Sequence, residues 1–80
     1  MEKRLGVAII IVEENTSLEK LNKIISSHSD MILGRQGIPM RERGISVISL
    51  VLEGTTDALG SLTGQIGKLA GIRIRSVLAS

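Results

Sequence analysis

The spacing of apolar and polar residues divides this chain into two kinds of segment, one typical of strands and one typical of helices. Residues 5–12, LGVAIIIV, form an almost unbroken apolar run that is rich in β-branched residues and has the length of a strand. Residues 45–54, ISVISLVLEG, form a second such run, and residues 31–38 form a weaker one that contains two glycines. Residues 72–79 start with the alternating sequence IRIR, which is typical of a strand with one wet face. The pattern therefore predicts four strands.

Two segments between these strands have the three- and four-residue spacing of amphipathic helices. The segment at 15–30 starts with Thr16 and Glu19 at capping-box spacing. The segment at 55–71 starts with three cap-type residues and reaches Gly71, where a helix is expected to stop. The predicted apolar stripes are Leu18, Leu21, Ile24, Ile25 and His28 in the first helix, and Leu59, Leu62, Ile66 and Leu69 in the second.

The resulting order β-α-β-β-α-β predicts an α+β fold. Right-handed crossovers favour folding this order into a four-stranded antiparallel sheet with both helices on one face, which is the ferredoxin-like fold. Residues 1–38 and 45–80 would each form a split β-α-β unit, with the first and third strands at the centre of the sheet. A chain of 80 residues has room for one domain, so we expect a single domain over residues 1–80.

The central strands are apolar on both sides, although two helices can cover only one face of the sheet. The two sides are Val7, Ile9 and Ile11 against Ala8, Ile10 and Val12 in the first strand, and Val47 and Val51 against Ile48, Leu50 and Leu52 in the third. We therefore expect an exposed aliphatic patch, and patches of more than a few hundred Å2 usually mark an interface or a ligand groove. This favours self-association over the alternative that long arginine stems simply shield a small apolar sheet.

Three glycines in the second predicted helix form a smooth stripe. Gly60, Gly64 and Gly67 lie nearly opposite the leucine stripe, and each internal glycine costs about 0.8–1.0 kcal/mol relative to alanine. Close approach of a second copy of the chain would compensate this cost, so the three are candidate oligomer contacts. The alternative is a poor helix that its core stripe holds in place.

Composition excludes several classes of function. The chain has no cysteine, which excludes disulfides, zinc–thiolate sites and iron–sulfur ligation by this chain. It has no aromatic residue to stack on a base, and its net charge of +2 is too small to indicate nucleic-acid binding. The longest apolar run, at 7–12, is far too short to span a bilayer, and no signal peptide is visible. We expect a cytoplasmic protein that does not bind a membrane or contact nucleic acid directly.

No catalytic, cofactor-binding or metal-binding set of residues can be assembled. His28 is the only histidine and ends an apolar stripe, where packing is the expected role. Glu13, Glu14 and Asp57 suit helix-dipole roles as well as acid–base chemistry. Phosphate-binding and nucleophile motifs are absent. Acylphosphatases share the predicted fold, but their phosphate-binding arginine after the first strand has no counterpart in VEENTS. We expect a protein that is not an enzyme, with an unrecognised small-substrate enzyme as the weakest alternative.

The segment RQGIPMRERGIS at 35–46 combines turn residues with arginines. Pro39 fixes φ and Gly44 permits a positive φ, so that Gly37, Pro39 and Gly44 predict a hairpin connection of about six residues.

Two roles are open for the arginines of this segment. Arg35, Arg41 and Arg43 would contact an anion, effector or partner if they converge on one carboxylate or phosphate, since guanidinium groups bind both in bidentate fashion. Alternatively, Glu42 pairs locally with Arg41 and Arg43, which would be worth about 0–1 kcal/mol on an exposed loop.

With these elements in order, the sequence from position 34 to 79 resembles the family of iron-only hydrogenase system regulators, small proteins with an ACT-like, ferredoxin-like fold. The residues that carry the resemblance are Arg35, Gly37, Ile38, Pro39, Arg41, Arg43, Gly44, Ile45, Gly54, Thr55, Thr56, Asp57, Leu62, Thr63 and Gly64. The resemblance implies a non-enzymatic, ligand-binding regulatory module, a transcriptional regulator. It implies no catalytic residue. The apolar face of the sheet predicts that the module acts as a homo-oligomer (dimer or tetramer), and the arginines of segment 35–46 predict a small acidic effector.

ACT-type modules pair through their sheets or edges and bind amino acids or other effectors at the subunit interface. Many keep a glycine after the first strand, where this chain has VEENTS. The metal-sensing domain of nickel-responsive repressors is similar in fold, but one histidine without cysteine does not supply its ligands. No DNA-binding segment is visible, so that regulation would act through a partner or a ligand. The competing hypothesis is a structural homo-oligomeric assembly domain that binds no small molecule.

Overall fold

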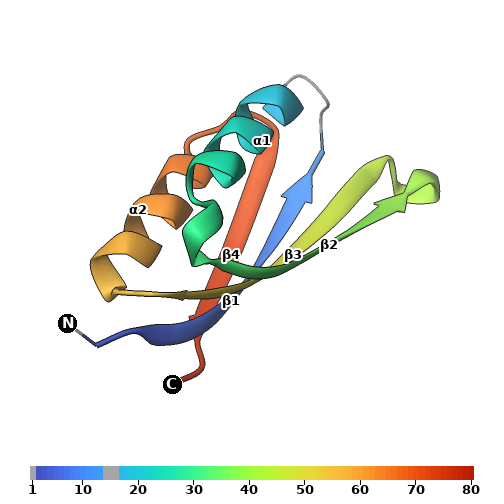
Figure 1. The fold of residues 1–80 in the computed structure, drawn as a ribbon. Helices are drawn as coiled ribbons and strands as arrows, with labels where there is room; N and C mark the ends of the chain where they lie inside the picture. Colours follow the sequence, from blue (N-terminus) through green and yellow to red (C-terminus); the bar gives the residue numbers. More distant parts are fainter. Residues whose placement is uncertain (1, 14–16) are drawn as a thin grey trace.

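The computed structural model describes residues 2–13 and 17–80, and its elements follow the predicted order (Figure 1). The strands are β1 (Arg4–Val12), β2 (Ile32–Met40), β3 (Ile45–Gly54) and β4 (Ile72–Leu78); the helices are α1 (Leu18–Ser27) and α2 (Thr56–Gly67), with short 3-10 helices η2 (Ser29–Met31) and η3 (Arg41–Arg43). All strand pairs are antiparallel, in the order β2-β3-β1-β4. The predicted α+β ferredoxin-like fold, with β1 and β3 at the centre, is confirmed.

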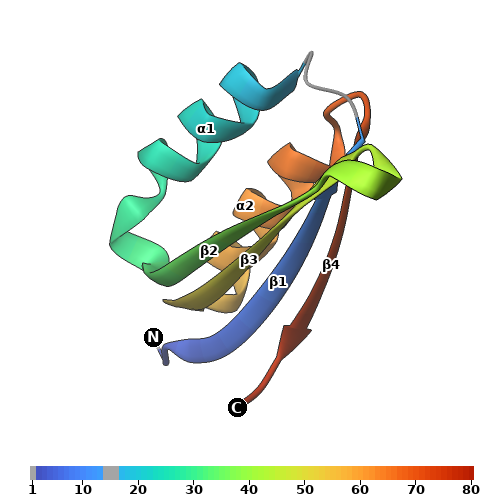
Figure 2. The ribbon, with the colours of Figure 1, turned by 90° about the vertical axis from the view of Figure 1, so that its right-hand side faces the viewer.

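Both helices lie on the same face of the sheet, and the other face has no helix over it (Figures 1 and 2). The strands alternate accordingly: Ile10 is paired with Ile48 of β3 and Ile74 of β4, and all three point to the helices. Together with side chains from α1 and α2 they form one aliphatic core. Its largest fully buried side chains are Ile10, Leu21, Leu50, Leu52, Leu62 and Ile66.

Helix α2 begins where the sequence predicts and ends earlier. The hydroxyl of Thr55 accepts a hydrogen bond of 3.1 Å from the backbone N–H of Ala58, which is the contact expected of an N-cap threonine. The helix ends at Gly67 and not at Gly71 as expected. Gly71 instead adopts a φ of 75° in the turn that leads into β4. Its left-handed conformation reverses the chain after the helix has ended, so it is a turn residue and not the helix stop.

Helix α1 begins at Leu18, and Thr16 of the expected capping box lies outside the described residues. Ser17, directly before the helix, is buried, and its hydroxyl donates a 2.7 Å hydrogen bond to the carbonyl of Ala70. This bond ties the start of α1 to the turn after α2. At the other end, half-buried His28 places Nδ1 2.7 Å from the carbonyl oxygen of Ile24, so that the imidazole packs on the helix end.

The hairpin between β2 and β3 is tighter than expected. β2 continues to Met40, with Pro39 opposite Ser46 and Met40 opposite Ile45. The predicted connection of about six residues is therefore wrong: the turn consists of η3 and Gly44, which has a φ of 67°. Proline is tolerated inside β2 because β2 is an edge strand, where a missing backbone N–H need not interrupt a ladder.

We predict that Leu62→Ala lowers the free energy of unfolding by about 2–5 kcal/mol, because it leaves a cavity in the core between α2 and the sheet. The matched control is Leu33→Ala, since Leu33 is 60% exposed and should lose less than about 0.5 kcal/mol. Urea denaturation at one protein concentration should be followed by far-UV circular dichroism, as the chain has no Trp or Tyr. Equal losses in the two variants would contradict this core.

A second prediction concerns the hairpin turn. Gly44→Ala should cost about 1–2 kcal/mol, because a Cβ disfavours the left-handed conformation that this residue adopts. Gly37→Ala is the control, as Gly37 has no positive φ and an added Cβ would meet no atom within 4 Å. The same denaturation experiment compares them. A loss for Gly37→Ala as large as that for Gly44→Ala would show that the turn conformation is not what makes Gly44 necessary.

Candidate functional site

The sheet surface without helices, the open face, is apolar across all four strands. It consists of Leu5, Val7, Ile9, Ile11, Ile38, Val47, Val51 and Val77. Val7 is paired with Val51 on one side and Val77 on the other, which makes one apolar row across β3, β1 and β4. A second row runs from Ile38 through Val47 to Ile11. The structure thus places the residues of the predicted aliphatic patch side by side.

Ile9 joins the two rows at the centre of the open face and is 50% exposed. Its neighbours across the sheet are Ser49 on β3 and Arg75 on β4, so that polar residues lie between the two rows. Polar residues also border the patch, with Arg73 opposite Ile11 and Glu53 opposite Leu5. Exposed side chains that would normally be scattered singly on a small domain are contiguous here. A surface of this kind is typical of an interface between proteins.

Two arginines line the β4 side of the open face. Arg73 is paired with Ile11 and Arg75 with Ile9 in the register of the sheet. Arg73 Nη2 lies 3.5 Å from Glu13 Oε1, with exposed side-chain fractions of 66% and 48%. Such an exposed pair contributes little to stability. It is the one ion pair within residues 2–13 and 17–80, so Arg75 has no carboxylate partner among them.

The three candidate glycines lie on the exposed surface of α2 next to β4. A Cβ added at Gly60 or Gly64 would meet no atom within 4 Å, and one at Gly67 would meet only Cγ2 of Ile74, at 3.7 Å. The stripe is therefore turned away from the core, on the side of the helix that faces the β4 edge of the sheet. The structure shows no contact within the chain that requires these glycines.

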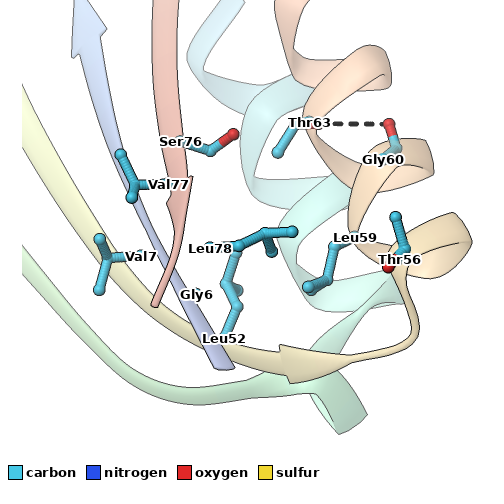
Figure 3. Close-up of a pocket in the computed structure, with 10 residues that line it drawn as sticks. All are labelled: Gly6, Val7, Leu52, Thr56, Leu59, Gly60, Thr63, Ser76, Val77 and Leu78. Carbon is cyan, nitrogen blue, oxygen red and sulfur yellow. Dashed lines mark hydrogen bonds between the residues drawn. The ribbon is translucent and has the colours of Figure 1, made fainter. Parts of the chain in front are cut away.

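A cavity of about 180 Å3 lies between α2 and the end of β4 (Figure 3). Leu59 and Leu78 form its apolar wall, and Ser76 and Thr63 lie at its upper side. The hydroxyl of Thr63 donates a 3.3 Å hydrogen bond to the carbonyl of Gly60. Gly6 also lines the cavity, and its lack of a side chain lets β4 lie close to β1. A Cβ at this position would stand 3.1 Å from the carbonyl oxygen of Val77 and would push β4 away from β1. This cavity was not predicted from the sequence, although a glycine inside the β-branched run of β1 indicates that another backbone segment approaches closely.

The arginines of the hairpin segment do not all meet. Arg41 and Arg43 belong to the exposed turn η3, whereas Arg35 lies within β2, where Nη2 donates a 3.0 Å hydrogen bond to Oδ1 of Asn22 in α1. Because an extended strand rises about 3.3 Å per residue, the backbones of Arg35 and Arg41 are about 20 Å apart. The structure therefore brings Arg41 and Arg43 to one turn and separates Arg35 from them.

The acidic residues and the histidine stay apart from one another. Glu13 is engaged with Arg73, and Asp57 lies in the first turn of α2; Glu14 lies outside the described residues. In the part of the chain that the structure describes, no three His, Asp or Glu side chains lie close enough to hold a metal ion. No helix there has the length and hydropathy needed to cross a membrane.

Among solved structures, the uncharacterized protein TM1266 from Thermotoga maritima is 32% identical and has a TM-score of 0.94, over 99% of this chain and 100% of that one. The C-terminal domain of the MgtC protein from Mycobacterium tuberculosis has a TM-score of 0.73 at 11% identity, over 95% of this chain and 87% of that one. The divalent ion tolerance protein CutA1 from Ehrlichia chaffeensis has a TM-score of 0.56 at 12% identity, over 100% and 85%. The last two share the fold alone.

A comparison with curated proteins finds no match. Residues 4–76 match the family TM1266-like, described as "Iron-only hydrogenase system regulator, putative". The match spans β1 to α2 and β4 as far as Ser76, and the similarity to the Thermotoga protein covers the same elements. This chain belongs to the TM1266-like family of iron-only hydrogenase system regulators.

Proposed function

We propose that this chain is a non-enzymatic regulatory module of an iron-only hydrogenase system and that it acts as a homo-oligomer. Family membership supports the regulatory role. The observation that carries the proposal is the open face, whose two apolar rows are exposed on a chain that has only two helices to cover four strands.

A second copy is the occupant that best fits the open face. A homodimer with two-fold symmetry buries the same patch on both copies, and sheets that pack face to face interdigitate side chains of the kind found here. The polar groups lie between the apolar rows and along the β4 side, so that Arg73 and Arg75 would remain at the rim of the contact. A dimer of dimers is compatible with the same surface.

The regulatory module would read a small acidic effector at the hairpin tip. Arg41 and Arg43 are both exposed in η3, and Glu42 between them forms no ion pair with either one within the described residues. The guanidinium groups of both arginines are therefore not paired with Glu42, and their N–H donors are available to a carboxylate or phosphate. The regulator would pass this signal to hydrogenase expression or maturation through a protein partner.

Assembly without a ligand is the competing function. The three residues of η3 form an exposed turn, which would hold an anion on the surface of the protein and not in a pocket. Exposed loop charges are usually solvated and bind anions weakly. The open face requires an oligomer under both functions, so that the effector, and not the oligomer, distinguishes them.

We predict that the wild-type protein sediments at two or four times its 8.6 kDa mass and that Ile9→Lys sediments near 8.6 kDa. The lysine would place a charge at the centre of the buried apolar contact, while Ile9 is exposed enough in the single copy for the variant to fold. Sedimentation velocity at several concentrations measures this, with Ser26→Lys on the exposed surface of α1 as the matched control. A wild-type mass of 8.6 kDa in concentrated samples would refute the proposal.

For the effector, we predict that inorganic phosphate, a dicarboxylate or a nucleotide raises Tm in a dose-dependent way, because a ligand of the native state stabilises it. Arg41→Ala combined with Arg43→Ala should weaken this binding at least about tenfold, since charge-assisted hydrogen bonds are lost. Arg35→Ala is the control, because Arg35 lies far from the tip and contacts Asn22. Calorimetry checks the affinities. No shift with any of these anions would favour the assembly function.

A further inference from the structure

We propose that the β4 edge of the sheet, together with the glycine surface of α2, binds an extended segment of another protein in which acidic and apolar residues alternate. This site lies at the edge of the sheet and adjoins the open face proposed for self-association. It would add the segment as a further strand beside β4, with backbone hydrogen bonds supplying affinity and alternate side chains supplying specificity.

The two edges of the sheet are built differently. β2 carries the features that prevent strand addition: a bulge at Leu33 between Ile32 and Gly34, and Pro39 close to its end. β4 pairs with β1 without a register shift from Ile72 to Leu78, and it contains neither glycine nor proline. Its outer edge has no neighbouring strand in the sheet order. The chain therefore protects one edge and leaves the other regular and open.

The surface above this edge has room for the side chains of an added strand. A strand beside β4 points alternate side chains to the helix layer, where Gly60 and Gly64 leave α2 without a side chain in the way. The cavity next to Gly60, of about 180 Å3, is lined by Leu59 and Leu78 (Figure 3). Since an apolar cavity of about 150 Å3 accommodates benzene, this one accommodates an aliphatic side chain. The helix side of the added strand would thus be apolar.

The other side of the added strand would be acidic. Its remaining side chains lie on the open-face side beside Arg73 and Arg75. Arg75 has no carboxylate partner in the described part of the chain, and Arg73 has only the long, exposed contact with Glu13. Carboxylates at alternate positions of the added strand complement both guanidinium groups. Opposite charges that face each other across neighbouring strands are stabilising.

The same charges argue against a second copy at this edge. An antiparallel pair of β4 strands centred on Ile74, Arg75 or Ser76 brings arginines of the two copies opposite or diagonal to each other. Like charges at these positions destabilise strand pairing. The edge therefore favours an acidic partner over another copy of this basic strand.

The test uses the full chain and a nine-residue peptide of alternating Glu and Val, titrated by calorimetry and by NMR of labelled protein. We expect amide shifts on β4 and α2, and no binding of a Lys–Val peptide. Arg73→Gln with Arg75→Gln should weaken binding about tenfold. Lys20→Gln with Lys23→Gln removes the same charge from the exposed surface of α1 and should leave binding unchanged. Equal weakening in both double variants would show charge attraction without a site and would overturn the proposal.

A second pair of variants tests the helix surface. Gly60→Leu should weaken binding of the Glu–Val peptide about tenfold by filling the approach to the cavity, and it should not unfold α2, since leucine has the higher helix propensity. Gln65→Leu, at another exposed position of the same helix, should have no effect. Unchanged affinity for Gly60→Leu, or amide shifts on β2, would overturn the proposal. A further result would overturn the proposal: the peptide fails to bind, and the oligomer mass is smaller in the Gly60→Leu variant than in the wild type. A second copy would then occupy the edge.

Discussion

Two helices can cover only one face of a four-stranded sheet, and the rest of this structure depends on that constraint. The helix-facing residues of β1 and β3 build the core with α1 and α2. The opposite residues of the same strands are almost as apolar and have nothing over them in the single chain. An antiparallel sheet that is stable alone would present polar residues there. Folding of this chain is therefore complete on one side of the sheet and leaves unburied apolar surface on the other.

The glycines of α2 show how little local propensity matters against burial. Gly60 and Gly64, which lie inside α2, together disfavour the helix by about 2 kcal/mol relative to alanine. Leu62 and Ile66 are fully buried beneath them, and burial of each such side chain contributes about 1.5–3 kcal/mol. Leu59 adds a third buried contact, so tertiary packing holds the helix despite its sequence. This burial offsets the cost of the glycines, and the glycines leave a smooth helix surface beside the open edge of β4.

The spacing of apolar and polar residues along the chain sufficed to predict the fold and a sheet that is apolar on both faces. Alternation alone places Val7 and Ile10 on opposite faces, because neighbouring residues of a strand point to opposite faces. It does not tell which face packs against the helices, since both sides of β1 are apolar, and the structure shows that this is the face of Ile10. The hairpin was less predictable, since whether Pro39 and Met40 lie in a turn or in β2 depends on pairing with β3. The cavity was not predictable from one strand, because it exists where Gly6 lets β4 approach β1 beneath α2. Features that depend on contacts between distant elements cannot be predicted from the local sequence pattern.

Face and edge of the sheet share residues, which connects the two proposed surfaces. Val7 and Val77 belong to the apolar row of the open face and also line the cavity at the β4 edge. A strand added at that edge would change the packing of both valines, and hence the free energy of association through the open face. By linkage, oligomerisation would change the affinity for the added strand by the same factor. Such a coupling between self-association and partner binding would give a regulator a physical means of transmitting a signal.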